Sequence, residues 1–405
     1  MSEITRSDVI ISGGGMVGMT LALALGRAGL DVAVLDRQML DLTMDPAFDG
    51  RASAIAYAGV RLFQGIGLWP HLEEHAEPIT DIRVSDKDSL LYLHFDHEEL
   101  GDGPLGMMLE NRHIRVGLAQ AVADTPNVAI HAPDEIASLE RESSGVTARL
   151  RSGRILKAPL IVAAEGRQSA VRDAAGIRIY RWEYEQSGIV ATIHHERPHM
   201  GIAHERFLPA GPFAILPLTG NRSSIVWTEP TERARTIMGL NQRGFDAEMA
   251  KRFGSFLGAT YSEGPRWSYP LSAHLADRFT DRRLAVIGDA AHGIHPIAGQ
   301  GLNLGLKDVA ALAEILVDAA RLGRDLGSDD LLAEYARWRR FDAVVLTAVT
   351  DSLNRLFSND LTPLRLARSL GLGIVHRMPR AKRLFMSHAR GTLGSLPRLL
   401  RGEAL

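Results

Sequence analysis

The residues best suited to chemistry lie between positions 284 and 303, where a carboxylate is followed by a glycine-rich turn. The apolar run 284–287 predicts a short buried strand that ends at Gly288 and Asp289. A turn containing Pro296 then leads into Gly301, and apolar residues at helical spacing follow. This order places one carboxylate at a strand end and free backbone N–H groups at a helix start, which favours an anion or an electron-rich ring edge. An ordinary strand–turn–helix connection is the alternative.

A second glycine-rich turn lies near the N-terminus, where an apolar strand runs into Gly13, Gly15 and Gly18. In this spacing the first glycine permits a tight turn, the second lets the backbone approach a pyrophosphate, and the third allows close helix–strand packing. Asp36 ends the next predicted strand, where its carboxylate can accept hydrogen bonds from ribose hydroxyls and would repel a 2′-phosphate. The pattern predicts FAD or NAD rather than NADP; a glycine-rich turn without a ligand is the alternative.

A third candidate segment follows the apolar run 160–164. Glu165 and Gly166 end this predicted strand, and a short segment containing Ser169 and Arg172 comes next. A carboxylate at a strand end could contact the same ligand as the two glycine-rich turns. A plain strand end followed by a helix N-cap is a fair alternative for Glu165 alone, although not for the whole segment.

The composition is that of a globular protein large enough for two or three domains. The net charge of −2 gives no global reason to expect a nucleic-acid partner. The chain has no cysteine, which excludes disulfides, thiolate zinc sites and cysteine-ligated iron–sulfur clusters. Several histidines lack carboxylates at ligand spacing, so core or solvated histidines are expected there rather than a metal site. They are His194, His195, His199 and His204.

In their order and spacing, the three segments resemble the FAD-dependent aromatic hydroxylases. Residues 288–303 resemble the motif GD-x-A-H-x-x-x-P-x-x-G-x-G-x-N, and residues 163–172 resemble a fingerprint in which Asp-Gly precedes x-x-S-x-V-R. Glu165 replaces the usual Asp, so its carboxylate reaches further by about a bond length. The runs 300–308, 211–217 and 356–360 make the resemblance closest to the ubiquinone-biosynthesis hydroxylases.

The resemblance implies FAD as the cofactor and a set of residues that bind it. Arg51, which is expected just before a helix, would lie beside the flavin, although the residues alone favour a solvated helix cap. Asn111 or Arg112, ahead of Arg115, would reach the cofactor from the start of another helix. Pro296 would line the cavity next to the flavin, and no general acid or base is identified. The predicted cofactor-binding residues are Gly13, Gly15, Met16, Val17, Gly18, Asp36, Arg37, Arg51, Asn111, Arg112, Glu165, Gly166, Gly288, Asp289, Pro296, Gly299, Gln300, Gly301, Leu302 and Asn303.

The elements that would position these residues form an α/β fold. We expect a discontinuous Rossmann-like FAD-binding domain, an inserted antiparallel β-sheet domain that binds the substrate, and a helical C-terminus. The FAD-binding domain is predicted at 1–78, 104–180 and 280–360, and the substrate domain at 79–103 and 181–279. A basic helical region is predicted at 361–405.

By resemblance, the chain is an FAD-dependent monooxygenase that hydroxylates the ring of a polyprenylated phenol in ubiquinone biosynthesis. It would use O2, a flavin C4a-hydroperoxide formed in a dry cavity, and electrons from NAD(P)H or a redox protein. A prenyl-chain reductase that uses FAD is a rival prediction. A non-catalytic lipid carrier with a flavoprotein fold is a second rival.

The termini bear on localisation. The N-terminus lacks a signal-peptide pattern and no apolar run approaches a membrane span, which predicts a cytoplasmic protein. The segment 361–401 contains nine Arg or Lys residues and no Asp or Glu, interleaved with apolar residues. This segment either packs on the FAD-binding domain with a solvated basic edge, or meets anionic lipids on the inner face of the membrane. The second alternative, together with the resemblance, also admits contacts with other ubiquinone-biosynthesis proteins.

Overall fold

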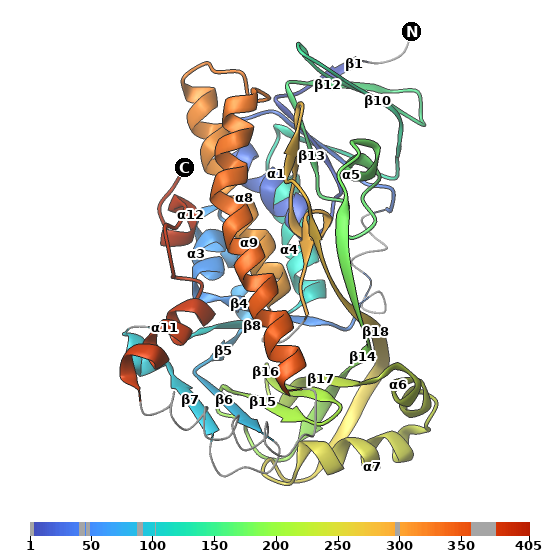
Figure 1. The fold of residues 1–405 in the computed structure, drawn as a ribbon, viewed down its shortest axis with the longest axis vertical. Coiled ribbons are helices and arrows are strands. Elements are labelled where there is room, and N and C mark those ends of the chain that lie inside the picture. The colour runs from blue at the N-terminus through green and yellow to red at the C-terminus, as the bar shows by residue number, and fades with distance from the viewer. Residues whose placement is uncertain are drawn as a thin grey trace.

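The computed structural model describes residues 4–39, 45, 49–86, 92–101, 103–295, 300–357 and 378–405. Over this part of the chain, helices and four β-sheets form an elongated molecule in which a helix-rich layered end and a sheet-rich end meet (Figure 1). Long strands run between the two ends. The predicted α/β fold class is confirmed.

A six-stranded sheet organises the helix-rich end. Its neighbouring strands are parallel except for the first pair, and all residues of its four central strands are buried. Such continuous apolar strands are typical of a parallel sheet that is covered on both faces. The order is β19 (Thr280–Asp281), β20 (Leu284–Val286), β13 (Leu160–Ala163), β2 (Val9–Ser12), β3 (Val32–Leu35) and β9 (Val128–His131).

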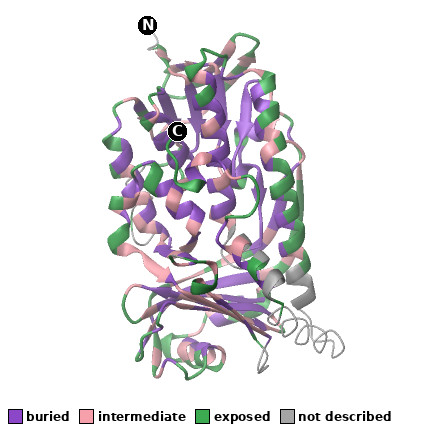
Figure 2. Cartoon of the chain, turned by 90° about the vertical axis from the view of Figure 1, so that its left-hand side faces the viewer, coloured by how far each residue is buried: buried purple, intermediate pink, exposed green. Residues whose placement is uncertain are grey.

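Helices pack around this sheet and contribute to one large apolar core, which appears in purple in Figure 2. Helix α8 packs against both α1 and α9, and α1 also packs against α4. The apolar spacing predicted after Gly301 agrees with the buried face of α8. The bounds are α1 (Met16–Arg27), α3 (Tyr57–Gly65), α4 (Asn111–Ala123), α5 (Ala170–Ala174), α8 (Gln300–Arg321), α9 (Asp329–Phe357) and α12 (Arg398–Arg401).

The sheet-rich end is an eight-stranded sheet whose neighbours are antiparallel, except for the parallel pair β15–β6. Helices α6 (Thr231–Met238) and α7 (Gln242–Phe253) cover one face through a cluster of buried apolar side chains. The order is β21 (His292–Gly293), β18 (Thr260–Ala276), β14 (Ile179–His195), β17 (Arg222–Pro230), β16 (Gly211–Leu218), β15 (Ile202–Leu208), β6 (Asp81–Asp86) and β7 (Tyr92–Asp96).

The opposite face of this sheet, which we call the inner face, is turned toward the helix-rich end. A second apolar cluster joins it to a small three-stranded sheet and to helix α11 (Pro379–Ala389). The small sheet contains β4 (Ala52–Ala56), β8 (Gly106–Glu110) and β5 (Glu77–Ile79). A peripheral four-stranded sheet contains β1 (Ile4–Arg6), β12 (Ile155–Ala158), β11 (Gly145–Leu150) and β10 (Ile136–Glu142).

One predicted local structure is wrong. Arg51 precedes strand β4 rather than a helix, and α3 begins only at Tyr57. Strand β4 pairs antiparallel with β8, with Ser53 opposite Leu109, and it buries Ile55 completely. Cross-strand hydrogen bonds and burial therefore outweigh the helix propensity of this alanine-rich segment.

The described part of the basic C-terminal region is tied into the protein. Lys382 is buried and forms an ion pair with Glu99, and the Arg390 guanidinium lies 4.1 Å from the centre of the Tyr57 ring. Arg398 pairs with Asp318 at 2.6 Å. These contacts favour the packed alternative for residues 378–405, whereas 361–377 lie outside the described residues. No helix among the described residues is long and apolar enough to cross a bilayer.

Candidate functional site

The three segments singled out in the sequence follow three adjacent parallel strands. Gly13 follows β2, Glu165 comes shortly after β13, and Gly288 comes shortly after β20. Because β20, β13 and β2 are neighbours in one parallel sheet, their carboxyl ends lie at the same edge. Ligands of open α/β sheets bind in the crevice outside this edge.

The first turn needs glycine for reasons that the geometry makes explicit. A Cβ atom at Gly18 would lie 1.9 Å from the carbonyl oxygen of Gly13, and one at Gly13 would lie 2.3 Å from that of Ala164. A Cβ at Gly15 would meet no atom within 4 Å. Gly15 is the N-cap of α1 and supplies no side-chain cap, so the first turn of the helix opens onto free space that a phosphate fits.

Val17 joins the first segment to the third. Its side chain lies 3.1 Å from the position of a Cβ at Gly288 and 2.8 Å from that of a Cβ at Gly305. Met16 and Val17 are themselves partly buried against the main core. Val17 of α1 therefore packs directly on Gly305 of α8, and the two glycine-rich turns border the same sheet edge.

Asp36 lies beside the first turn, immediately after β3. Its Oδ2 accepts a 2.6 Å hydrogen bond from the backbone N–H of Gly14, and its Oδ1 accepts one from Gln38. Arg37 is exposed next to it. The carboxylate thus lies at the end of the turn, at the position that the spacing predicts.

Glu165 has a structural role in this geometry. Its Oε1 accepts a 2.8 Å hydrogen bond from Ser12, and its Oε2 accepts bonds from the Ser169 hydroxyl and from the Val171 backbone N–H. The carboxylate therefore ties β2 to the start of α5, as the N-cap alternative predicts. Gly166, with φ of +77°, turns the chain directly after it.

The third segment presents one exposed carboxylate on a rigid base. The Asp289 side chain is 50% exposed and lies 3.4 Å from Arg167 Nε. Beneath it, buried Asp308 accepts a 2.9 Å bond from the Gly288 N–H and pairs with His292 at 2.6 Å and with Arg339 at 2.9 Å. His292 therefore helps to shape the turn.

The start of α8 also supports this turn. Asn303 is buried; its Oδ1 accepts a 2.8 Å bond from the Ala56 N–H, and its Nδ2 donates to the Ala54 carbonyl. A Cβ at Gly301 would meet no atom within 4 Å, so space remains at this helix start. Leu302 is partly buried. Pro296 and Gly299 lie outside the described residues, as does the side chain of Gln300.

A buried carboxylate that was not predicted, Asp49, organises the residues around Arg51. It pairs with Arg51 at 2.8 Å and with Arg115 at 2.5 Å, and it accepts a 3.2 Å hydrogen bond from Asn111. Burial opposes the ionisation of Asp49, but the hydrogen bond and charge of Arg51, with help from Arg115, hold its pKa well below the ordinary value. Asp49 stands only two residues before Arg51, which is the one sequence signal that pointed to it.

Arg112 faces away from this group. Its Nη2 lies 3.3 Å from Glu110, which Arg222 also approaches. Of the three candidates near the start of α4, Asn111 and Arg115 are therefore the ones that reach Asp49. The Tyr269 ring, from β18 of the large sheet, packs beneath the Arg51 guanidinium at 4.8 Å and was not predicted.

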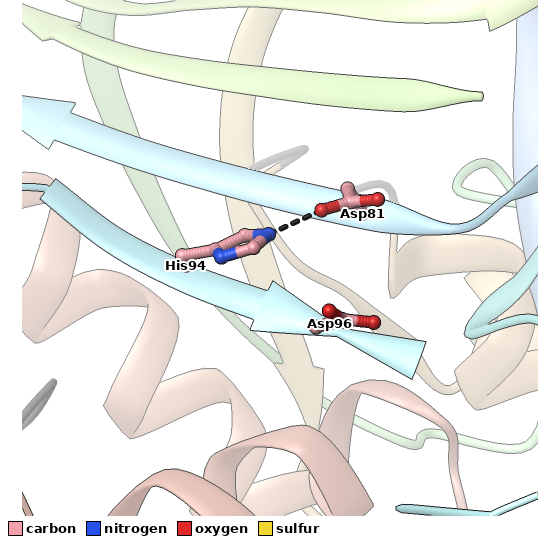
Figure 3. A group of neighbouring side chains, drawn as sticks. All are labelled: Asp81, His94 and Asp96. Carbon is pink, nitrogen blue, oxygen red and sulfur yellow. Dashed lines mark hydrogen bonds and ion pairs between the residues drawn. The ribbon is translucent and has the colours of Figure 1, made fainter. Parts of the chain in front are cut away.

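A separate cluster occupies the far edge of the large sheet, on β6 and β7 (Figure 3). The carboxylates of Asp81 and Asp96 belong to directly opposed residues, and His94 forms a hydrogen bond with Asp81. Like charges directly opposed across two strands repel each other. His94 offsets this repulsion, which accounts for the cluster without a ligand.

The sheet edge has two open helix starts and a carboxylate after β3, and an apolar sheet faces it. These features together are those of a dinucleotide-binding flavoprotein. A family model described as FAD binding domain matches residues 6–350. The ubiquinone hydroxylase UbiL of Rhodospirillum rubrum is 50% identical over 402 residues, which cover 98% of this chain and 94% of that protein. The 3-demethoxyubiquinol 3-hydroxylase of Escherichia coli is 35% identical over 387 residues, 95% of this chain and 98% of that protein.

A solved structure agrees in fold. The p-nitrophenol 4-monooxygenase PnpA from Pseudomonas putida superposes with a TM-score of 0.81 at 20% identity, over 97% of this chain and 100% of that chain. The chain belongs to the FAD-dependent aromatic hydroxylases, within their ubiquinone-biosynthesis hydroxylase family. Its cofactor is FAD, and the open cradles at Gly15 and Gly301 fit a dinucleotide.

Proposed function

We propose that this protein is an FAD-dependent monooxygenase that hydroxylates the ring of a polyprenylated phenol in ubiquinone biosynthesis. The observation that carries the proposal is the juxtaposition of the cofactor edge with the apolar inner face of the large sheet. Tyr269 on that face contacts Arg51. The Trp267 ring packs closely on the backbone of Gly50. A Cβ atom at Gly50 would lie 1.8 Å from this ring. The names of the relatives support the same reaction.

Residues of the first and third segments divide the binding of FAD between them. The start of α1 at Gly15 is placed to bind the pyrophosphate, and Asp36 to accept hydrogen bonds from the ribose. Asp289 is placed to bind the ribityl chain, and the start of α8 at Gly301 to stabilise negative charge on the reduced ring. Arg51 lies at the boundary between these groups and the sheet, and the charge of Asp289 acts on it.

The bound flavin supplies oxygen activation, and the protein supplies a dry cavity for it. The inner face of the sheet is largely apolar, and its cluster with β8 and α11 excludes water from one side. The electrons come from NAD(P)H or from a redox protein. Because the proposed substrate is a lipid, we also propose peripheral contact with the inner face of the membrane and with other ubiquinone-biosynthesis proteins.

Two measurements test this function. A purified protein without a flavin spectrum would favour the lipid carrier over the enzyme. Growth of a gene-deletion strain should lead to accumulation of a quinone precursor that lacks one ring hydroxyl, as detected by mass spectrometry. Accumulation of an unsaturated prenyl chain on a fully hydroxylated ring would instead indicate the prenyl-chain reductase.

A further inference from the structure

One buried acid on the inner face has no assigned role. The side chains of strand β15 alternate between the two faces of the sheet, and Ala203, Glu205 and Phe207 are buried on one face. The adjacent His204 and Arg206 lie on the other side, where His204 packs against Phe256 at 4.7 Å and Arg206 donates to a carbonyl at the end of α7. Glu205 is therefore on the inner face, and its residue exposure is 9%.

The strand register connects Glu205 to the cofactor side. Glu205 is opposite Ala214, Ala214 is opposite Val226, Val226 is opposite Val190, and Val190 is opposite Trp267. Residues directly paired across a sheet share a face, so these five side chains form one lateral row. Trp267 at the end of this row packs on the backbone beside Arg51. The row thus runs from the flavin boundary to a single carboxyl group over apolar side chains.

The inner face keeps open space along this row. Val226 and Leu216 belong to central strands, yet both are only partly buried. Their neighbours on the other face, Ile225 and Trp227, are 0% exposed beneath α6 and α7. Among the described residues, the inner face is therefore less completely covered at its centre than the outer face.

The carboxyl of Glu205 lacks a polar partner in the described part of the chain. None of the described residues forms a hydrogen bond or an ion pair with it, and Val84 and Ala214 flank it in the register. Burial alone raises the pKa of Glu205 to about 8. Asp86 lies two residues beyond Val84 on the same face of β6 and is the other acid there. An unpaired buried carboxyl costs stability, and such groups concentrate at functional sites.

His295 is another buried titratable group near the cofactor-binding segment 288–303, and it fits this role less well. Neither of its ring nitrogens has a hydrogen-bond partner among the residues that the structure describes, and burial lowers its pKa to about 4. It is 0% exposed and packs edge-on against Tyr184 at 5.0 Å. Its buried ring nitrogens are therefore less suited than Glu205 to meet a substrate hydroxyl.

We propose that Glu205 is a catalytic residue that accepts the proton of the substrate's ring hydroxyl. The proposal rests on the hydroxylase function proposed above. The phenol O–H bond breaks, an O–H bond to the Glu205 carboxylate forms, and the freed electron pair is delocalised into the ring. That charge makes an adjacent ring carbon a better nucleophile toward the activated oxygen.

The remaining steps balance with the reaction as a whole. One atom of O2 becomes the new hydroxyl group and the other leaves as water, with two electrons drawn from the reduced FAD. The hydroxylated carbon loses its hydrogen as a proton to water, the ring regains its aromaticity, and Glu205 returns its proton to the original ring oxygen. The raised pKa of Glu205 brings this carboxylate closer in basicity to a phenolate, since the pKa of a phenol is about 10.

The test is a single-turnover experiment on the FAD-loaded protein, reduced with dithionite and mixed with O2 and ortho-prenylphenol. In the wild type, hydroxylation should speed up with pH to about 8, because the ionised carboxylate is the active form. Glu205→Gln should keep its FAD, lose product formation by about 100-fold or more, and lack this pH dependence. Its reduced flavin should still be reoxidised, releasing hydrogen peroxide.

His204→Gln, which alters the outer face of the same strand, is the matched control and should behave as wild type. Glu205→Asp keeps a carboxylate and should retain the pH dependence at a lower rate. If the Gln variant loses FAD, the Asp variant tests the role of Glu205 in its place. A Glu205→Gln or Glu205→Asp variant with the wild-type rate and pH profile would overturn the role of Glu205 alone. A wild type that holds FAD but hydroxylates no phenol would overturn the proposed function itself.

Discussion

Two guanidinium groups meet the buried carboxylate of Asp49 beside the cofactor edge. Asp49→Asn leaves Arg51 and Arg115 without their carboxylate, and we expect it to lower the free energy of unfolding by about 3 kcal/mol. The folded-state pKa of Asp49 lies below its unfolded value, so its stabilisation is present above about pH 4 and is lost as the pH falls below it. Urea unfolding of the two proteins should therefore differ at pH 7 and converge toward pH 2. Equal stability at pH 7 would show that the pair does not stabilise the fold.

Asp289 is the exposed carboxylate from which we expect the largest loss of cofactor binding. A hydrogen bond to a charged group contributes about 1.5–3 kcal/mol, so Asp289→Ala should weaken FAD binding about tenfold to a hundredfold. The flavin-to-protein absorbance ratio after gel filtration measures this loss. Asp330→Ala removes an acid that pairs with Arg324 away from the site, and it should retain full flavin. Full occupancy in Asp289→Ala would contradict the assigned contact.

Residue roles were only partly predictable from spacing. The glycines and Asp36 could be placed because their positions follow from backbone geometry and a fixed distance along the chain. Arg112 and Glu165 could not, because their partners, Glu110 and Ser12, depend on side-chain orientation and on strands far apart in sequence. Asp49 carries no pattern of its own and acquires its role only when α4 brings Arg115 to it.

At the scale of elements, close packing of α1 on the sheet decides where the cofactor edge forms. Gly18→Ala should push α1 away from the Gly13 carbonyl, which lies 1.9 Å from the added methyl. We expect a loss of about 1–3 kcal/mol in unfolding free energy and weaker FAD retention. Gly239→Ala adds a methyl that has its nearest contact at 3.5 Å, and it should change neither quantity appreciably. A Gly18→Ala protein with normal stability and flavin would contradict the packing argument.

Elements with their own apolar periodicity were predictable, as α8 illustrates. Strand β4 was not, because its alanine-rich sequence becomes a strand only through pairing with β8, more than fifty positions away. The arrangement of β20, β13 and β2 as neighbours was likewise beyond the pattern, although the resemblance implied it. The pairing partner of a strand depends on the tertiary structure, whereas apolar periodicity can be read from the local sequence.

At the scale of the whole molecule, two layers meet at one boundary: the carboxyl edge of a parallel sheet and the inner face of an antiparallel one. The parallel sheet supplies the edge for the dinucleotide, and the antiparallel sheet supplies the apolar face for the substrate ring. Oxygen chemistry on a phenol requires both in the absence of water. The long strands β14 and β18 fix the two layers relative to each other (Figure 1).

The proposed membrane contact depends on side chains that the folded protein leaves exposed on α11. On α11, Arg383 and Phe385 are exposed, while Lys382 is held by Glu99. The double variant Arg383→Glu, Phe385→Asp should therefore reduce sedimentation with anionic vesicles without loss of FAD. Sedimentation of this variant equal to that of the wild type would end the idea that α11 meets the membrane.

The most direct measurement follows the oxygen atom. The purified flavoprotein, reduced and then mixed with ortho-prenylphenol under 18O2 in ordinary water, should yield a ring-hydroxylated product that carries one 18O atom, as read by mass spectrometry. A product with oxygen from water, or a protein that holds FAD but only reduces the prenyl double bond, would contradict the account.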